Sequence, residues 1–371
     1  MLIGVPKEIK PHEHRVGLVP ASVRELTLHG HQVLVETGAG AGIGIDDAAY
    51  RAAGANIAAA PAEIFAMAEM VVKVKEPVAA EYRLIREEQT VFTYLHLAAD
   101  PPQAEALLQS GCIAIAYETV TDGRGRLPLL APMSEVAGRM SIQVGAHLLE
   151  KLPGGAGILL GGVPGVHAAK VVVLGGGISG TNAIRMAMGM EAQVYVIDKS
   201  LDRLYELDLQ FGPMLNTIFA TVATIEQHVT TADLVIGAVL VPGAAAPRLL
   251  TRDMIRKMRP GSVFVDIAID QGGCAETSRP TTHDNPTYIE EGVVHYCVTN
   301  MPGAVPRTST FALNNATLPF VLALADKGFR KAVQDDANLA AGVNVVRGRL
   351  TNEAVAKSLG MSYTPLRQAL G

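Results

Sequence analysis

The sequence has few cysteines, no tryptophan and no excess of basic residues. Its three cysteines, Cys112, Cys274 and Cys297, lie far apart and lack the spacing of a metal site, so we expect reduced thiols and no bound metal. Lys and Arg total 31 and Asp and Glu total 36, which gives a formal charge of −5. This balance lacks the basic surface typical of proteins that bind nucleic acid or anionic lipid, so we predict neither partner.

Long hydrophobic runs are also missing. The most apolar segment, 154–180, is interrupted by Pro164, His167, Lys170 and several glycines, whereas a membrane-spanning helix needs about 20 apolar residues in succession. The N-terminus becomes charged at Lys7, which is too early for a secretory signal peptide. We therefore expect a cytoplasmic protein with no membrane partner, in keeping with an odd number of cysteines.

The composition that remains is that of a compact α/β protein. Hydrophobic residues make up 49% and charged residues 18% of the chain, which excludes extensive disorder. The 37 glycines and 21 prolines follow no period, which excludes a collagen-like repeat. At about 150 residues per domain, 371 residues predict two domains.

The N-terminal part alternates short apolar runs with helical patterns, which predicts a parallel sheet flanked by helices. The expected strands are 2–5, 32–36, 70–75, 91–95 and 113–117. The expected helices are 21–29, 46–53 and 103–109.

A second α/β series follows a long helix predicted over 134–152, with Ser134 as its N-cap. Five short runs, several rich in Val or Ile, are typical of a doubly wound sheet; they are 171–174, 194–197, 234–239, 263–268 and 295–298. Beyond residue 305 the pattern is helical again, over 318–327 and 335–346, and this tail can complete the first domain.

A dinucleotide-binding motif lies at the start of the second series. Gly175, Gly177 and Gly180 satisfy G-x-G-x-x-G directly after an apolar strand and at the start of a helix, and the next strand ends in Asp198. Glycines here permit a tight turn, close approach of a pyrophosphate and close helix packing, and the acidic residue accepts hydrogen bonds from a ribose. A carboxylate at that position favours NAD over NADP, although the nearby cations Lys199 and Arg203 leave NADP as an alternative. The alternative is a glycine-rich turn with no ligand.

Polar residues close several of the predicted strands, where ligands bind in open α/β sheets. Asp270 follows one strand of the second series, although a turn-forming Asp is an equally good interpretation. In the first series, Lys73 and Lys75 alternate with valines and are predicted to share one strand face, and His96 follows Tyr94 in the same way. Singly, a Lys is more often a surface residue and a His a structural one.

Together, Arg15, Lys75, His96 and Asp270 supply what an amino- or keto-acid oxidoreductase needs. Arg15 and Lys75 provide cations for a carboxylate and a carbonyl oxygen, and His96 and Asp270 provide acid–base groups. This combination predicts an enzyme, because a protein that only senses NADH has no use for a carboxylate-binding cation.

Seven segments resemble the alanine dehydrogenase family, in order and in register, from residue 3 to past residue 315. They are 3–8 with Arg15-Val16, 72–77, 94–98, 134–139, 175–180 with Asp198, 266–273 and 300–308. The resemblance implies NAD-dependent, reversible oxidative deamination of L-alanine to pyruvate and ammonia by a homohexamer. It also implies two Rossmann-like doubly wound domains with a cleft between them, the first discontinuous (1–130 plus 306–371, binding substrate) and the second binding NAD (131–305).

The resemblance assigns roles to individual residues. Arg15 and Lys75 would bind substrate, and His96 and Asp270 would be the catalytic pair. The residues that would hold the cofactor, besides the three motif glycines, are Ser134, Ile178, Ser179, Asp198, Arg203, Val239, Ile267, Ala268, Ile269, Asp270, Arg279, Val298, Thr299, Asn300 and Met301. Many members have a Ser near position 220, where this chain has Ala220 and Thr221, so that contact is not assigned.

Two other functions share part of this pattern. The NAD-binding subunit of proton-translocating transhydrogenase has the same fold but tends to have Glu in the loop where this chain has Asp270. An NADH-sensing regulator would keep the fold without Arg15, Lys75 and His96.

Overall fold

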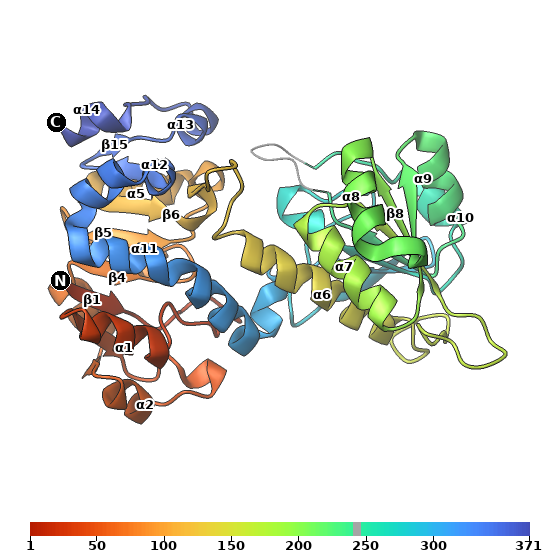
Figure 1. Cartoon of the computed structure of the whole chain (residues 1–371), viewed down its shortest axis with the longest axis horizontal. Coiled ribbons are helices and arrows are strands. Elements are labelled where there is room, and N and C mark those ends of the chain that lie inside the picture. The colour runs from red at the N-terminus through yellow and green to blue at the C-terminus, as the bar shows by residue number, and fades with distance from the viewer. Residues whose placement is uncertain (240–245) are drawn as a thin grey trace. The chain divides into compact units, whose positions relative to one another are not determined.

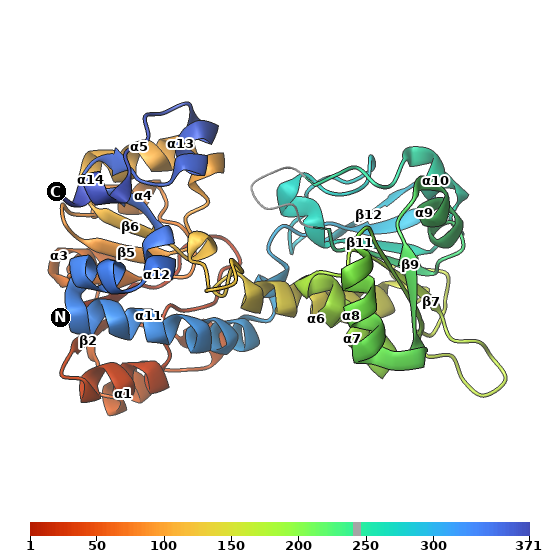
Figure 2. The same cartoon turned by 45° about the horizontal axis from the view of Figure 1, so that its top comes forward.

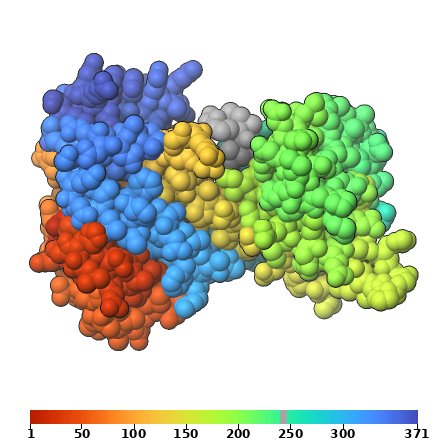
Figure 3. Space-filling model, viewed as in Figure 1, coloured from red at the N-terminus to blue at the C-terminus, as the bar shows by residue number. Residues whose placement is uncertain are grey.

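The computed structural model describes residues 1–239 and 246–371, which form two compact units. The first unit combines Met1–Met133 with Val305–Gly371, and the second is Ser134–Ala304. The red and blue ends of the chain pack together in the first unit (Figures 1 and 3). Each unit is an α/β sheet with flanking helices, which confirms the predicted fold class.

The sheet of the first unit has eight strands in the order β15-β14-β6-β5-β4-β1-β2-β3. Strands β1 to β6 are parallel and follow the doubly wound order 3-2-1-4-5-6, whereas β14 and β15 are antiparallel additions at one edge. The strands are β1 (Leu2–Val5), β2 (Gln32–Glu36), β3 (Asn56–Ala58), β4 (Met70–Val72), β5 (Thr90–Thr93), β6 (Ile113–Ala116), β14 (Val343–Val346) and β15 (Arg349–Leu350).

Helices cover both faces of this sheet (Figure 2). They are α1 (Pro20–Leu28), α2 (Asp47–Ala52), α3 (Pro61–Met67), α4 (Ala79–Tyr82), α5 (Pro101–Ser110), α11 (Pro306–Asp335), α12 (Ala337–Ala341), α13 (Glu353–Leu359) and α14 (Leu366–Leu370). Asn314 of α11, which is buried, joins the two chain ends: its amide donates to the Gly17 carbonyl and accepts from Ser22 and the Val19 amide.

The sheet of the second unit has the order β12-β13-β11-β10-β7-β8-β9, in which the six parallel strands again follow 3-2-1-4-5-6. The antiparallel strand β12 adds one edge. The elements are α6 (Ala131–Leu148), β7 (Lys170–Leu174), α7 (Ile178–Gly189), β8 (Gln193–Asp198), α8 (Leu201–Phe211), β9 (Leu215–Phe219), α9 (Val222–Val229), β10 (Leu234–Gly237), α10 (Arg252–Lys257), β11 (Val263–Asp266), β12 (Thr287–Glu290) and β13 (Val293–Tyr296).

The central strands are uniformly apolar because helices cover both of their faces. Val171, Val172 and Val173 of β7 and Phe264 of β11 have no exposed surface. A parallel strand buried on both sides shows no alternation of apolar and polar residues, which is why these runs predicted a doubly wound sheet.

Three local predictions are wrong. The helix predicted over 335–346 is a short helix, α12, followed by strand β14, because the Val-rich end of the segment pairs with β6. Ser134 lies inside α6, which begins at Ala131, and so is not its N-cap. The strand predicted to continue to Lys75 ends at Val72, so Lys73 and Lys75 follow the strand.

The three cysteines are buried free thiols. Burial raises the pKa of Cys112 to about 11 and that of Cys297 to about 12, and it raises the pKa of Cys274 as well. Because thiolates are the reactive form, we expect the native protein to resist Ellman's reagent at pH 8 and all three thiols to react in guanidinium chloride. Rapid reaction of one thiol in the native protein would contradict the burial described.

Candidate functional site

The predicted substrate residues of the first unit follow the carboxyl ends of neighbouring strands. Arg15 lies in the connection after β1, Lys75 follows β4 and His96 follows β5. Strands β1 and β4 flank the point where the strand order reverses, which is where open α/β sheets bind ligands. Gly17 allows the connection after β1 to approach β4, since a Cβ there would lie 2.4 Å from the Val72 carbonyl oxygen.

Arg15 is almost completely buried and is held by an acidic neighbour. Its Nε donates to Glu13 Oε1 at 2.7 Å and its Nη2 donates to Glu13 Oε2 at 2.5 Å. Its Nη1 donates to the sulfur of Met133 at 3.0 Å. Burial opposes the charge, but the hydrogen bonds and charge of Glu13 outweigh it and raise the pKa of Arg15. The side chain is therefore a fixed, permanently charged cation.

A buried charge cluster fixes the backbone that carries Lys75. Glu8 accepts hydrogen bonds from the amides of Val74 at 2.7 Å and Lys75 at 3.3 Å. Lys73 lies between two acids, with its Nζ 2.7 Å from Glu81 and 3.5 Å from Glu8. Burial opposes the charge on Lys73, but the two carboxylates raise its pKa. Lys73, which is 1% exposed, is thus held in a buried ion-pair cluster, whereas the side chain of Lys75 is half-buried.

His96 is exposed and has a left-handed backbone conformation with a φ of 51°. The carboxylate of Glu118 accepts a hydrogen bond from the His96 amide at 2.6 Å and so holds this conformation. The imidazole stacks on Tyr94, with ring centroids 5.8 Å apart and planes 8° apart. Tyr94 in turn donates to the Leu129 carbonyl at 2.6 Å. The imidazole of His96 is therefore supported on one face by Tyr94, and its backbone is held by Glu118.

The motif glycines of the second unit behave as a dinucleotide-binding turn requires. Gly175 has a φ of 96°, and a Cβ on Gly180 would lie 1.9 Å from the Gly175 carbonyl oxygen. Around a Cβ on Gly177, by contrast, no heavy atom of the described residues lies within 4 Å, apart from its chain neighbours and the backbone of its own helix. This open space lies at the N-terminus of α7, where backbone amides favour a phosphate, so the residues present fit an NAD pyrophosphate.

Asp198 and Arg203 organise the same turn. Asp198 accepts hydrogen bonds from the amides of Gly176 at 2.7 Å and Ser200 at 2.9 Å. Arg203 donates through Nε to the Gly176 carbonyl at 2.7 Å and through Nη2 to Thr181 at 2.7 Å. Arg203 therefore buttresses the glycine turn, a contact that the sequence motif did not indicate.

Asp270 lies in the turn Ile267–Gln271 directly after β11, and its side chain is exposed. The turn is organised by Asp266, which has no exposed surface. Asp266 accepts hydrogen bonds from the amides of Ala268 at 3.0 Å and Cys274 at 2.9 Å and from the hydroxyl of Ser278 at 2.5 Å. Burial raises the pKa of Asp266 even though these three donors lower it.

The other predicted cofactor residues also lie in the second unit. Val239 follows β10, and residues 298–301 follow β13, so both lie at the carboxyl edge of the sheet. Arg279 is exposed and its guanidinium lies 3.8 Å from the centre of the Tyr288 ring. Ser134 is half-buried in α6, which packs against the glycine turn: a Cβ on Gly138 would lie 2.1 Å from the Ser179 carbonyl oxygen.

Sequence reasoning missed the acidic residues that hold the predicted ones. Glu8, Glu13, Glu118 and Asp266 each accept a hydrogen bond from the side chain or the backbone amide of a predicted site residue. Asp266 could have been found, because it ends an apolar strand four residues before Asp270. Glu118 lies 22 residues from His96, and no local pattern links the two.

An alanine substitution tests the open space at Gly177. We expect Gly177→Ala to leave the thermal midpoint almost unchanged and to weaken NADH binding at least about tenfold, because the added methyl group projects toward the pyrophosphate. Gly189→Ala is a matched control on the same helix, since a Cβ there also has no described residue within 4 Å other than its chain neighbours and the backbone of that helix. Calorimetric titration with NADH measures both variants, and equal affinities would exclude this ligand position.

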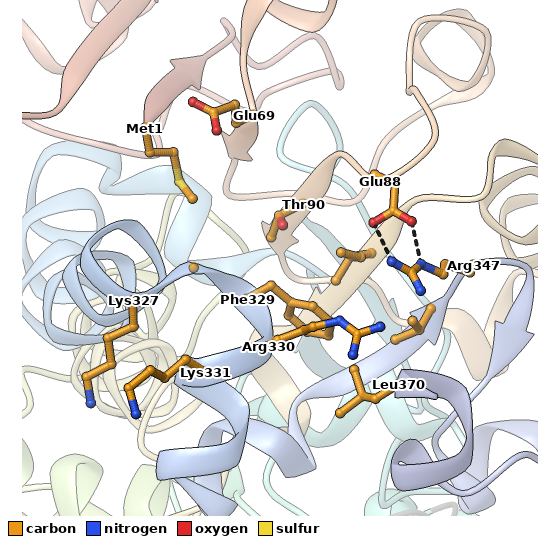
Figure 4. A pocket seen from close by; sticks show the side chains of 13 residues that line it. Met1, Glu69, Glu88, Thr90, Lys327, Phe329, Arg330, Lys331, Arg347 and Leu370 are labelled. Carbon is orange, nitrogen blue, oxygen red and sulfur yellow. Dashed lines mark hydrogen bonds and ion pairs between the residues drawn. The ribbon is translucent and has the colours of Figure 1, made fainter.

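A pocket of about 410 Å³ lies elsewhere on the first unit (Figure 4). As far as the chain is described, its lining includes none of the predicted site residues. Its cations are largely neutralised: Lys327 and Lys331 pair with Asp335, and Arg347 pairs with Glu88. We therefore place the candidate substrate site at the carboxyl ends of the strands of the first sheet.

Over residues 1–239 and 246–371, no group of three or more His, Cys, Asp or Glu side chains could hold a metal ion. In the same part of the chain, none of the helices is both long and apolar enough to span a membrane.

The fold and the glycine turn define a two-domain α/β protein with a Rossmann-type dinucleotide-binding unit. Family models described as the N-terminal and C-terminal domains of alanine dehydrogenase/PNT match residues 4–137 and 141–353. The chain belongs to the alanine dehydrogenase/PNT family.

Similar proteins cover the whole chain. An alanine dehydrogenase of Halomonas elongata is 58% identical over 371 residues, which is all of both chains. One of Bacillus subtilis is 56% identical over all of this chain and 98% of its own. A solved L-alanine dehydrogenase superposes with a TM-score of 0.95 at 53% identity over 97% of this chain and 99% of its own. A transhydrogenase from Sinorhizobium meliloti gives 0.83 at 25% identity, over 94% and 100%.

Proposed function

We propose that this protein is an enzyme that catalyses the reversible, NAD-dependent oxidative deamination of L-alanine to pyruvate and ammonia. The observation that carries the proposal is the placement of Arg15, Lys75 and His96 after three strands at one edge of one sheet. A carboxylate-binding cation, a carbonyl-polarising cation and an acid–base group are what a small 2-oxo or 2-amino acid requires. Full-length similarity to alanine dehydrogenases supports the choice of substrate.

In this proposal Arg15 binds the substrate carboxylate and Lys75 binds its carbonyl oxygen. The positive charge of Lys75 stabilises the negative charge that develops on that oxygen. His96 exchanges a proton with the water and with the oxygen of the carbinolamine as ammonia is released or added. Asp270 orients the amino group or takes a proton from it. The buried cluster around Lys73 holds the Lys75 backbone, and Glu118 holds that of His96, so neither needs to be ordered during the reaction.

The cofactor in this proposal is NAD, bound at Gly175, Gly177 and Gly180 with Asp198 on the adenosine ribose. When bound, it supplies the hydride acceptor in deamination and the donor in amination. Asp198 disfavours the 2′-phosphate of NADP through like-charge repulsion. The remaining cofactor contacts are assigned to Ser134, Ile178, Ser179, Arg203, Val239, Ile267, Ala268, Ile269, Asp270, Arg279, Val298, Thr299, Asn300 and Met301.

The test is to mix the purified protein with pyruvate, ammonium and NADH and to follow the absorbance of reduced nicotinamide. Loss of absorbance that requires all three components supports reductive amination, and a series of larger 2-oxo acids then sizes the pocket. Binding of NADH without consumption would instead support a transhydrogenase-like carrier or a sensor, and the roles given to His96 and Asp270 would be abandoned.

We further propose a cytoplasmic homohexamer whose substrate domain is 1–130 plus 306–371 and whose NAD domain is 131–305. Exposed apolar side chains on the second unit are available for subunit contacts. Leu152, Leu159, Val163 and Val166 are 53–99% exposed, in the connection between α6 and β7. Light scattering coupled to gel filtration measures the mass, and a monomer would exclude the hexamer.

A further inference from the structure

Glu13 and Arg15 form a bidentate ion pair at the predicted substrate site. The carboxylate accepts from Nε at 2.7 Å and from Nη2 at 2.5 Å, and Oε1 also accepts from the Arg15 amide at 3.1 Å. The side chains of Arg15 and Glu13 are 2% and 1% exposed. Two parallel hydrogen bonds between planar groups fix both the position and the rotation of the guanidinium.

This geometry determines which part of Arg15 faces away from Glu13. Glu13 occupies the edge formed by Nε and Nη2, and Nη1 lies on the opposite side and donates to the Met133 sulfur at 3.0 Å. A thioether is a weak hydrogen-bond acceptor, whereas a carboxylate is a strong one. Exchanging the sulfur of Met133 for a carboxylate oxygen therefore gains more at Nη1 than at the two nitrogens that Glu13 already binds.

The negative charge of Glu13 also stabilises the buried guanidinium of Arg15. A lone buried guanidinium is unstable in a site of low polarity, and Glu13 offsets this cost. Besides Glu13, Tyr94 and Glu8 of the first unit act electrostatically on Arg15. Glu13 thus offsets the positive charge of Arg15, and a further cation, Lys75, follows the adjacent strand.

We propose that Glu13 is a positioning residue that fixes the guanidinium of Arg15 and presents Nη1 to the carboxylate of a small 2-oxo or 2-amino monocarboxylic acid, in place of the Met133 sulfur. The proposal rests on the substrate-binding role given to Arg15 under the proposed function. Glu13 itself acts through Arg15, so its loss should alter substrate affinity and leave cofactor affinity unchanged.

The experiment is steady-state kinetics of Glu13→Gln in the amination direction, with the full-length protein. We expect the KM for pyruvate to rise on the order of ten- to a hundredfold, because a neutral amide cannot hold the guanidinium by two charge-assisted hydrogen bonds. The kcat and the KM values for NADH and ammonium should stay within about threefold. Asp233→Asn is a control for the loss of a buried acid, because Asp233 pairs with Arg259 at 2.9 Å in the second unit.

A second variant separates positioning from a general loss of structure. Glu13→Ala removes the carboxylate, and added formate can occupy the space left by it. We expect formate, but not chloride at equal ionic strength, to lower the KM for pyruvate in this variant. Equal effects of the two salts, an unchanged KM in Glu13→Gln, or KM values for pyruvate and NADH that rise together would overturn the proposal.

A parallel variant distinguishes this proposal from the proposed function. If Arg15→Gln leaves the KM for pyruvate unchanged, the role of Arg15 itself is wrong. If Arg15→Gln raises that KM and Glu13→Gln does not, only the role of Glu13 is wrong.

Discussion

Replacing His96 with alanine is expected to lower kcat by at least about a thousandfold while the affinity for NADH stays within about twofold. The imidazole is the acid–base group of the proposed reaction, and such groups contribute about 10²- to 10⁴-fold. The cofactor-binding turn lies in the second unit, whereas His96 follows β5 of the first. The substitution therefore removes proton transfer and leaves the glycine turn intact.

Nicotinamide fluorescence provides the binding measurement for this variant, because the chain contains no tryptophan that could act as an intrinsic reporter. His147→Ala is the control, since His147 is exposed on α6 and its pairing with Glu150 is also at the surface. Turnover retained by His96→Ala would refute the role of His96. Loss of NADH binding would show instead that the substitution disturbs the fold.

Lys73→Met is expected to destabilise the first unit by about 3–5 kcal/mol, because it leaves the carboxylates of Glu8 and Glu81 buried without their cation. Glu8 also holds the amides of Val74 and Lys75, so the loss should reach the substrate site. Chemical denaturation followed by circular dichroism gives the free energy of unfolding. Lys357→Met is the control, because Lys357 is an exposed lysine of the same unit. This substitution should change the free energy of unfolding by less than about 0.5 kcal/mol.

The defect of Lys73→Met should also depend on pH. Burial already raises the pKa of Glu8, which the charge of Lys73 opposes, so removal of Lys73 raises it further. When the pKa of a carboxyl group is higher in the folded than in the unfolded state, the folded protein loses stability as the pH rises through the folded-state pKa. We therefore expect a larger difference from the unsubstituted protein at pH 8 than at pH 5, and an equal difference at both would argue against the buried charge.

The parts of the fold that depend on local pattern could be predicted from the sequence. The strands around Val172 and Phe264 are apolar throughout because both sheet faces are covered. The glycines at 175 and 180 each meet a distinct backbone requirement, and Gly177 leaves open space at the start of the helix. Strand β14 could not be predicted in this way, because its pairing with β6 joins segments more than 200 residues apart. Its residues follow a helix closely, so the helical pattern was extended too far.

The candidate site shows the same division. Arg15, Lys75 and His96 follow predicted strands, and the topology brings them to one sheet edge. The acids that hold them were missed, since Glu8 and Glu118 pair with backbone amides of other loops. These hydrogen bonds depend on which strands are neighbours in the sheet, and the strand order cannot be inferred from local sequence patterns.

The composition of the first unit from both chain ends has a consequence for synthesis on the ribosome. Domains generally fold as units while the chain is being made, starting from the N-terminal side. Residues Ser134–Ala304 form a unit by themselves and can fold once they emerge from the ribosome. The sheet of the first unit, by contrast, is completed only after β14 has emerged. The buried Asn314 must also emerge before it can form its hydrogen bonds with Gly17, Val19 and Ser22. The second unit, which is inserted between the two parts of the first, is therefore completed first. The N-terminal segment Met1–Met133 is translated earliest but is among the last to reach its final packing.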